Sequence, residues 1–255
     1  MKRTHLFEFE DYPWFPNWLR KCMTRYIVAF HRILKSKHEL AKLLAKALPY
    51  AKEPHIVDLC SGSGGPMLDV LEELKQTHHL EQVKVTFSDL YPNLEVAEEV
   101  QILNDPHISY RTEPLDATKV DPSLQGVRTM ICSLHHMKPA VAKQILADAK
   151  QAKQPFLAFE LSDNRFPNWL MWPTLPLNVL TVLLITPFVR PMSWQQLVFT
   201  YLIPLLPIFI GWDGAVSNVR TYTMEDMEKL TKDLQASDYQ WEMGTLEGKP
   251  PKLYL

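Results

Sequence analysis

The sequence has little cysteine and almost no excess of charge of either sign. Its 255 residues include three cysteines, and its formal net charge is -2. Three widely spaced cysteines form neither a disulfide framework nor a metal-ligand pattern, so we expect a reducing, cytoplasmic compartment and no metal site. A nearly balanced charge provides no basic face, which argues against a nucleic-acid partner.

The N-terminus also lacks the apolar run of a signal peptide. Residues 1–16 read MKRTHLFEFEDYPWFP, with acids and prolines where that run would stand, so we do not expect secretion. We find no internal repeat and no low-complexity linker. The length suits one large domain, or one domain that carries an insertion.

The sequence does contain a regular alternation of apolar and amphipathic segments. Residues 17–35 and 37–48 predict helices, because their apolar residues recur at three- and four-residue steps. The next predicted strands are HIVDL, VKVTFSD, ISYRTE, VRTMICSL and PFLAFEL, and the helices between them are MLDVLEELKQ, LEVAEEVQIL and PAVAKQILADAKQ. Strands that alternate with helices of this length indicate an α/β fold with a parallel sheet covered on both faces.

Two segments near the C-terminus complete the predicted fold. TYTMEDMEKLTKDL predicts a helix in which Thr223 is the N-cap and Asp226 stands at the capping-box position. YQWEMGTLEG and KLYL are expected to form an antiparallel pair of strands.

Three glycines follow the first of the alternating strands, in the stretch DLCSGSGGP at residues 58–66. Glycine is costly to order, so this cluster suggests a ligand that needs close approach of the backbone. A glycine-rich turn between a strand and a helix lies at the carboxyl edge of an open sheet, where ligands bind. A P-loop is excluded because no Gly-Lys-Ser/Thr follows. The dinucleotide fingerprint is incomplete because Met67 occupies the place of its third glycine.

A third interpretation is the loop that holds S-adenosylmethionine. Residues 54–161, with the ending from Thr223 onward, resemble the class I S-adenosylmethionine-dependent methyltransferases. IVDLCSGSGGP is similar to their first motif, VTFSDLYP to the second and EPLDATKV to the adenine-side motif. MICSLHHM occupies the fourth-strand position beside the transferred methyl. Cys60 replaces the first glycine of the family's loop, which is a departure from the pattern.

The resemblance implies cofactor contacts for individual residues. Asp58 would order the loop or reach the ammonium group through water, and Asp89 would bind the ribose hydroxyls. Asp116 would meet the adenine amine, and Ala117 would leave room for the ring. The complete set of predicted cofactor-binding residues is Asp58, Cys60, Ser61, Gly62, Gly64, Asp89, Leu90, Asp116, Ala117 and Ser133. The alternative for each acid is a helix cap or a turn residue.

Candidates for the methyl-transfer chemistry follow the fourth and fifth predicted strands. His135 or His136 is a candidate general base, because imidazole titrates near neutrality. Glu160 is a candidate for binding the substrate or ordering water. The alternatives are that the histidines only cap or pack a loop, and that Glu160 is a paired structural acid.

Two further segments supply candidates for substrate contact. In WDGAVSNVRTYT these are Asp213, Arg220 and Tyr222, and the guanidinium of Arg220 either clamps a carboxylate or phosphate or pairs with a neighbouring acid. In DYPWFPNW they are Tyr12 and Trp14. In this family the residues before the first motif often form a lid, and aromatic faces there would steady the sulfonium. The alternative is a hydrophobic anchor for the first helix.

An apolar insert of about 166–212 is the most unusual part of the chain. Residues 166–189 and 191–212 contain no charged side chain. A membrane span needs about 20 apolar residues. However, the prolines leave uninterrupted pieces of only 177–186 and 192–203, which predict helices of about 15 and 18 Å. A helical lid, a dimer contact, an interfacial membrane attachment and a kinked span all stay open.

The resemblance and the insert together lead to a functional hypothesis. We expect a Rossmann-like, doubly wound, seven-stranded sheet with an antiparallel last strand, in which residues 1–50 form a helical lid and residues 51–255 the methyltransferase core. The implied cofactor is S-adenosyl-L-methionine, and the implied acceptor is a hydrophobic, amphiphilic or lipid-like small molecule. The alternatives are an aminopropyl transferase and a non-catalytic, cofactor-binding protein at the membrane surface. A homodimer and peripheral contact with the inner membrane surface stay open.

Overall fold

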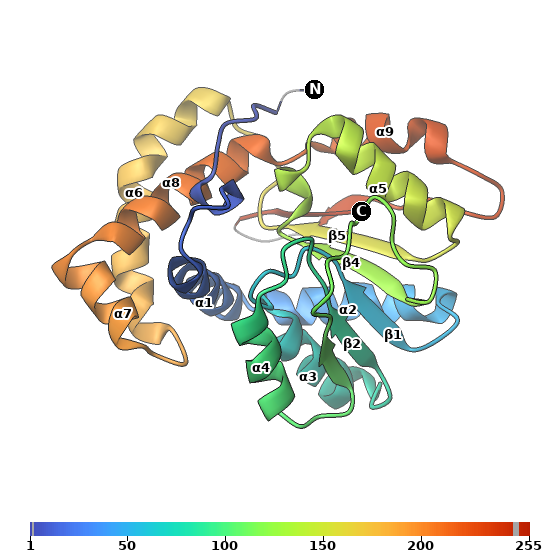
Figure 1. The fold of residues 1–255 in the computed structure, drawn as a ribbon. Coiled ribbons are helices and arrows are strands. Elements are labelled where there is room, and N and C mark those ends of the chain that lie inside the picture. The colour runs from blue at the N-terminus through green and yellow to red at the C-terminus, as the bar shows by residue number, and fades with distance from the viewer. Residues whose placement is uncertain (2, 247–249) are drawn as a thin grey trace.

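The computed structural model describes residues 1, 3–246 and 250–255, and its centre is a seven-stranded sheet (Figure 1). The strand order is β3-β2-β1-β4-β5-β7-β6. The strands are β1 (His55–Asp58), β2 (Lys84–Phe87), β3 (Ile108–Tyr110), β4 (Val127–Ile131), β5 (Phe156–Glu160), β6 (Gly244–Leu246) and β7 (Lys252–Tyr254). The first five are parallel, and β7 runs antiparallel to both of its neighbours. The predicted fold class is confirmed.

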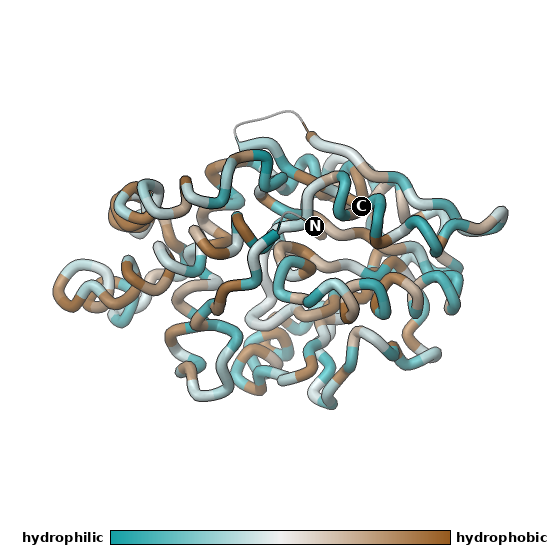
Figure 2. The backbone as a smooth tube through the Cα atoms, turned by 90° about the horizontal axis from the view of Figure 1, so that it is seen from above, coloured by the Kyte–Doolittle hydropathy of each residue, from teal (hydrophilic) through white to brown (hydrophobic). Residues whose placement is uncertain are grey.

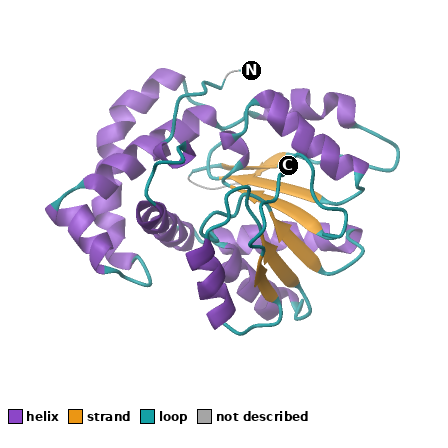
Figure 3. Ribbon diagram, viewed as in Figure 1, coloured by secondary structure: helices purple, strands orange, loops and turns teal. Residues whose placement is uncertain are grey.

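Helices cover both faces of this sheet (Figure 3). They are α2 (Ser36–Ala47), α3 (Met67–His78), α4 (Leu94–Ile102), α5 (Pro139–Gln151) and α9 (Met224–Thr231). Successive strand residues point to opposite faces. Ile56 therefore packs in a cluster with Leu40 of α2, whereas Val57 packs in a second cluster with Ile145 of α5 and Met227 of α9.

The predicted strands end earlier than the apolar runs suggest, because their last residues turn into the loops at the carboxyl edge. VRTMICSL, for example, leaves the sheet after Ile131, and Cys132 has a φ of 52°.

The capping box of α9 is confirmed: Thr223 Oγ1 accepts a hydrogen bond from the Asp226 N–H at 3.2 Å. The antiparallel pair at the C-terminus is confirmed as β6 and β7, and residues 247–248 of the predicted segment lie outside the described residues.

The apolar insert forms a helical unit beside the sheet (Figure 1). It contains α6 (Met171–Ile185), α7 (Trp194–Leu197) and α8 (Leu205–Arg220). The expected limit of residues 177–186 for the first helix is wrong, since a continuous helix covers Asn168–Phe188. The physical reason is that Pro173 lies in the first turn of α6, where an N–H needs no partner within the helix, and only Pro176 interrupts the interior.

The first helix of the chain, α1 (Asn17–Ile33), packs mainly against this insert, and its C-terminal end reaches the sheet, where His31 Nε2 lies 3.6 Å from Cys132 Sγ. Its Cys22 and Tyr26 share a buried cluster with Val182 of α6 and Ile210 of α8. Residues 1–50, predicted as one lid, therefore pack in two places, because α2 belongs to the sheet core.

The insert is rich in apolar residues (Figure 2), and many of its large apolar side chains are exposed. The helix Asn168–Phe188 has a mean hydropathy of 1.5 over its best window, and 22% of that window is buried. At 1.5 Å per residue its length is about 31 Å, enough to cross a membrane. The segments Trp194–Leu202 and Leu205–Arg220 meet the same criterion only as a pair, bent by 85°.

Candidate functional site

The loop between β1 and α3 has a backbone that favours glycine. Gly62, Gly64 and Gly65 have φ values of 53°, 94° and 50°, and a Cβ atom at any of them would meet nothing within 4 Å. Cys60 also has a positive φ, 57°, at the place where the resemblance expects a glycine. A left-handed conformation costs such a residue about 1–2 kcal/mol. The loop therefore borders open space that a ligand in backbone contact requires.

Hydrogen bonds join this loop to the loops that follow β2 and β3. The Ser61 hydroxyl donates to the Asp58 carbonyl at 2.7 Å. The Gly62 N–H donates to Asp89 Oδ2 at 2.9 Å, and the Leu115 N–H donates to the Asp89 carbonyl at 2.8 Å. Three of the predicted motifs are thus brought together around Asp89.

The two other predicted acids of this region differ in environment. Asp58 is buried and accepts a 2.6 Å hydrogen bond from Thr129 Oγ1, and burial raises the pKa of Asp58 to about 7. Asp116 is exposed, and its Oδ1 accepts hydrogen bonds from both the N–H and the hydroxyl of Thr118, at 2.8 and 2.7 Å. Asp116 therefore closes a local turn, which is the alternative that the sequence left open for it.

The remaining predicted cofactor residues line the same edge. Ala117 is buried beside Asp116, and Leu90 is exposed beside Asp89. Ser133 follows β4, and its buried hydroxyl has no hydrogen-bond partner. Burial raises the pKa of the Cys60 thiol, which favours its protonated and unreactive form.

A short turn after β4, Leu134–His136, carries both predicted histidines. Glu160, the last residue of β5, accepts hydrogen bonds from the backbone N–H of His135 at 3.1 Å and from its Nδ1 at 2.8 Å. Burial opposes a charge on this ring, but the carboxylates of Glu160 and Glu8 outweigh burial and raise the pKa of His135 to about 10. Such an imidazolium keeps its proton, so in this state His135 is poorly suited to the predicted role of base.

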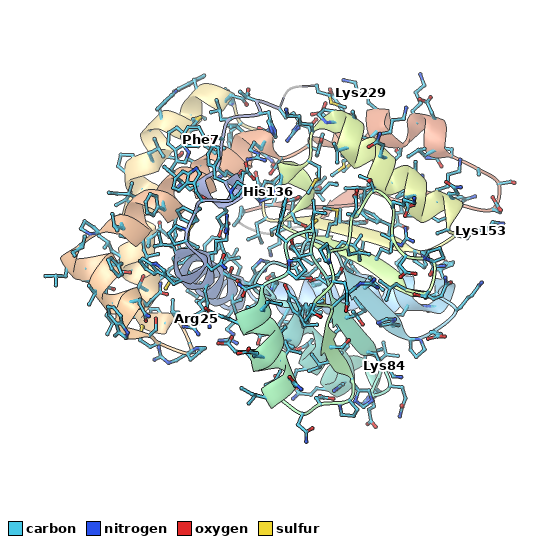
Figure 4. The ribbon with its side chains drawn as sticks, viewed as in Figure 1. Phe7, Arg25, Lys84, His136, Lys153 and Lys229 are labelled. Carbon is cyan, nitrogen blue, oxygen red and sulfur yellow. The ribbon has the colours of Figure 1, made fainter. Side chains whose placement is uncertain are left out.

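The N-terminal segment supplies two acids that sequence reasoning missed. Asp11 Oδ1 lies 2.8 Å from His136 Nδ1, and Glu8 lies beside both histidines. Figure 4 shows His136 next to this segment, between α8 and the sheet. Burial opposes ionisation of Glu8, but His136, His135 and Arg220 outweigh it and hold the pKa of Glu8 below its usual value. The acids in FEFED were a visible signal, but nothing local pairs them with histidines 125 residues away.

Arg220 and Asp213 of α8 fasten this segment in place. Arg220 is fully buried, and its Nη1 donates to Asp11 Oδ2 at 2.5 Å while its Nη2 donates to the His136 carbonyl at 3.0 Å. Asp213 Oδ1 accepts a hydrogen bond from the Phe9 N–H at 2.9 Å. Arg220 is therefore paired with a neighbouring acid, the alternative that the sequence left open.

The predicted aromatic substrate residues lie in different surroundings. Tyr222 is fully buried in the sheet core, and its hydroxyl donates to the Met137 carbonyl at 2.7 Å. Tyr12 and Trp14 are exposed and stack on each other, with ring centroids 5.6 Å apart. Phe15, not Trp14, is the buried anchor of this segment. Of the three predicted residues, only Tyr12 and Trp14 are accessible to a ligand.

Comparisons with known proteins give structural but no sequence matches. No family model and no curated protein matches the chain. The pyocyanin biosynthetic protein PhzM aligns with 86% of this chain and 53% of its own, at 13% identity and a TM-score of 0.48. The mitomycin 7-O-methyltransferase MmcR aligns with 86% of this chain and 52% of its own, at 15% identity and a TM-score of 0.48. An O-methyltransferase family protein from Burkholderia thailandensis aligns with 87% of this chain and 56% of its own, at 12% identity and a TM-score of 0.46.

The chain thus spans about half the length of these solved structures. Its own strand order, with β7 antiparallel between β5 and β6, is that of the Rossmann-like class I methyltransferase fold. The fold implied by the four sequence motifs is therefore present, with those motifs at the carboxyl ends of β1, β2, β3 and β4.

Proposed function

We propose that this protein is an S-adenosylmethionine-dependent methyltransferase that acts on a hydrophobic or amphiphilic small molecule. The observation that carries the proposal is the glycine loop, which faces open space and is joined through Gly62 to the carboxylate of Asp89. When bound, the cofactor supplies a methyl group on a sulfonium centre. The surrounding residues fit its other parts, since carboxyl groups and small residues stand at three successive strand ends.

The chain's own groups have separate tasks in this proposal. The backbone of Gly62 and Gly64 would admit the amino-acid part of the cofactor, and Asp89 would accept hydrogen bonds from its ribose hydroxyls. Each charge-assisted hydrogen bond of this kind contributes about 1.5–3 kcal/mol. Asp116 and Ala117 would border the adenine. Beyond them, the pairs Glu160–His135 and Asp11–His136 would orient the acceptor and restrict water at the end of β4.

The test is incubation with methyl-labelled cofactor and a cell lipid extract. We expect S-adenosylhomocysteine to form and the label to appear in an apolar product.

Asp89→Ala should weaken cofactor binding by about 2–4 kcal/mol in calorimetry, through loss of the ribose contacts. Asp233→Ala is the control and should leave cofactor binding unchanged, because Asp233 is an exposed acid paired with Lys143 far from the loop. Unchanged affinity of Asp89→Ala would remove the proposed cofactor site. A transferred aminopropyl group, or binding without turnover, would favour the alternatives.

We also propose that the protein is cytoplasmic and contacts the inner membrane surface through the insert. Large apolar side chains are exposed all along it, namely Phe166, Trp169, Trp172, Leu177, Leu180, Leu184, Phe188, Trp194, Leu197, Tyr201, Leu202, Ile203 and Ile208. Tryptophans and an uncharged face suit the headgroup region of a bilayer. Peripheral contact is favoured over a span by Asn168–Phe188, because this helix packs along α8. The α8 helix carries Asp213 and Arg220, whose partners lie in the N-terminal segment.

A further inference from the structure

Three side chains at the end of β4 direct metal-ligating atoms at one another. Among the described residues, Glu8, His135 and His136 each offer one such atom, all within 4.8 Å of one another. We propose that these three residues bind one divalent transition-metal ion of the zinc and iron class. The sequence predicted no metal site, because its ligands come from segments more than 120 residues apart.

The distances suit one ion between the three groups. His135 Nε2 lies 3.8 Å from Glu8 Oε1, and His136 Nε2 lies 3.6 Å from Glu8 Oε2. Two ligand atoms bound at about 2.1 Å to a tetrahedral ion lie about 3.4 Å apart. These two separations are within a few tenths of an ångström of that value, and all three ligand atoms lie within 4.8 Å of one another, so small side-chain rotations would bring them onto one ion.

Both imidazole rings are held in the orientation of a metal ligand. His135 Nδ1 lies 2.8 Å from Glu160 Oε2, and His136 Nδ1 lies 2.8 Å from Asp11 Oδ1. Metal-bound histidines nearly always donate their second ring nitrogen to a carboxylate or carbonyl, which fixes the tautomer and the ring direction. Here that bond occupies each Nδ1 and leaves each Nε2 directed at Glu8.

Glu8 itself points to a missing cation. Its side chain is buried, and its Oε1 accepts no hydrogen bond even though Arg220 Nη1 lies 3.1 Å away. Three carboxylates, those of Glu8, Asp11 and Glu160, surround the pair of rings, and they outnumber the guanidiniums beside them, those of Arg220 and Arg3. In a largely buried cluster such an excess of negative charge is costly unless a cation balances it. A metal ion held by the two Nε2 atoms would take the place of the proton that His135 otherwise keeps.

The ligand set selects the class of ion. Imidazole nitrogens suit zinc and iron, whereas calcium and magnesium prefer oxygen ligands alone. Three protein ligands leave at least one position for water or a substrate oxygen. His136 is 23% exposed and gives the ion a path from solvent. The idea that this open position binds the methyl acceptor rests on the proposed function, whereas metal binding itself does not.

The experiment is a titration of chelator-treated protein with Co²⁺ followed by absorption spectroscopy, with Zn²⁺ content measured after loading and dialysis. We expect one ion per chain, and visible absorption bands typical of nitrogen and oxygen ligands. Glu8→Gln and His136→Asn should each lower the affinity by more than about 100-fold. The exposed His79 is a matched control, because it lies at the end of α3, and His79→Asn should bind as the wild type does.

A second variant separates ligand orientation from general damage. Asp11→Asn keeps all three ligands and removes the carboxylate behind His136, so we expect a 10- to 100-fold loss of metal affinity. If Glu8→Gln does not fold by circular dichroism, the partly exposed His136→Asn decides. Absence of stoichiometric binding, or equal binding by His136→Asn and wild type, would overturn the proposal. Calorimetry with S-adenosylmethionine on the metal-free protein reports separately on the proposed function.

Discussion

At the scale of single residues, Asp58 shows how burial changes a group's titration. Its carboxyl group lies beneath the glycine loop and accepts a hydrogen bond from the Thr129 hydroxyl. Burial outweighs that bond, so the pKa of Asp58 is raised to about 7. The folded protein therefore holds a proton here that the unfolded chain releases near pH 4.

We predict that Asp58 makes the fold less stable as the pH rises from about 4 to 7, because in this window the native state binds more protons than the unfolded state. Asp58→Asn should remove this dependence. Between pH 4 and 7 the free energy of unfolding of the variant should therefore rise relative to that of the wild type, by about 1.4 kcal/mol for each unit by which the pKa of Asp58 is shifted. Urea denaturation between pH 4 and 8 measures it. Asp116→Asn, on the neighbouring exposed loop, is the control, and parallel profiles for Asp58→Asn and wild type would contradict the prediction.

At the scale of elements, the packed helices α6 and α8 approach each other closely at Gly211. A Cβ atom at Gly211 would lie 2.9 Å from Val179 Cγ2, and Val179 is β-branched and cannot easily turn away. A Cβ atom at Gly214, one turn further along α8, would meet only Asn178 Nδ2 at 3.8 Å. Both glycines therefore lie inside the same helix, but only Gly214 has room for a Cβ atom.

We predict that Gly211→Ala destabilises the protein relative to Gly214→Ala by about 1–3 kcal/mol, the usual cost of overpacking. Gly214→Ala should be neutral or stabilising by up to about 1 kcal/mol, because alanine favours a helix. Chemical denaturation of both variants provides the measurement. Equal free energies of unfolding for the two variants would contradict the prediction, because they would mean that α6 and α8 can move apart at Gly211 without loss of stability.

At the scale of the whole molecule, the chain has two unlike parts. The sheet is covered on both faces by helices, whereas the helical insert, with α1 packed on one side, leaves large apolar side chains in contact with solvent. Surfaces of this kind mark an interaction site, and here a bilayer or a second copy of the chain is the candidate.

We predict that the protein floats with phosphatidylcholine–phosphatidylglycerol vesicles. Leu180→Glu combined with Leu184→Glu should lower the partition coefficient by about 100-fold or more, because each buried leucine contributes about 1.5–3 kcal/mol and every 1.4 kcal/mol changes an equilibrium constant tenfold. Ile102→Glu with Leu103→Glu is the matched control, since both residues are exposed apolar side chains near the end of α4, far from the insert. Light scattering without lipid tests the homodimer, and a lipid-independent dimer that does not float would contradict membrane contact.

The sequence by itself determined the alternating elements, the parallel sheet, the strand end at Asp58 and the loops that carry Asp89 and Asp116. These follow from local periodicity and from the rule that polar residues after parallel strands share one edge. Only the tertiary structure decided that Glu8 and Asp11 meet His135 and His136. It also decided that α1 belongs with the insert and that α6 continues through its prolines. Such pairings depend on contacts between segments far apart in the chain, which no local pattern encodes.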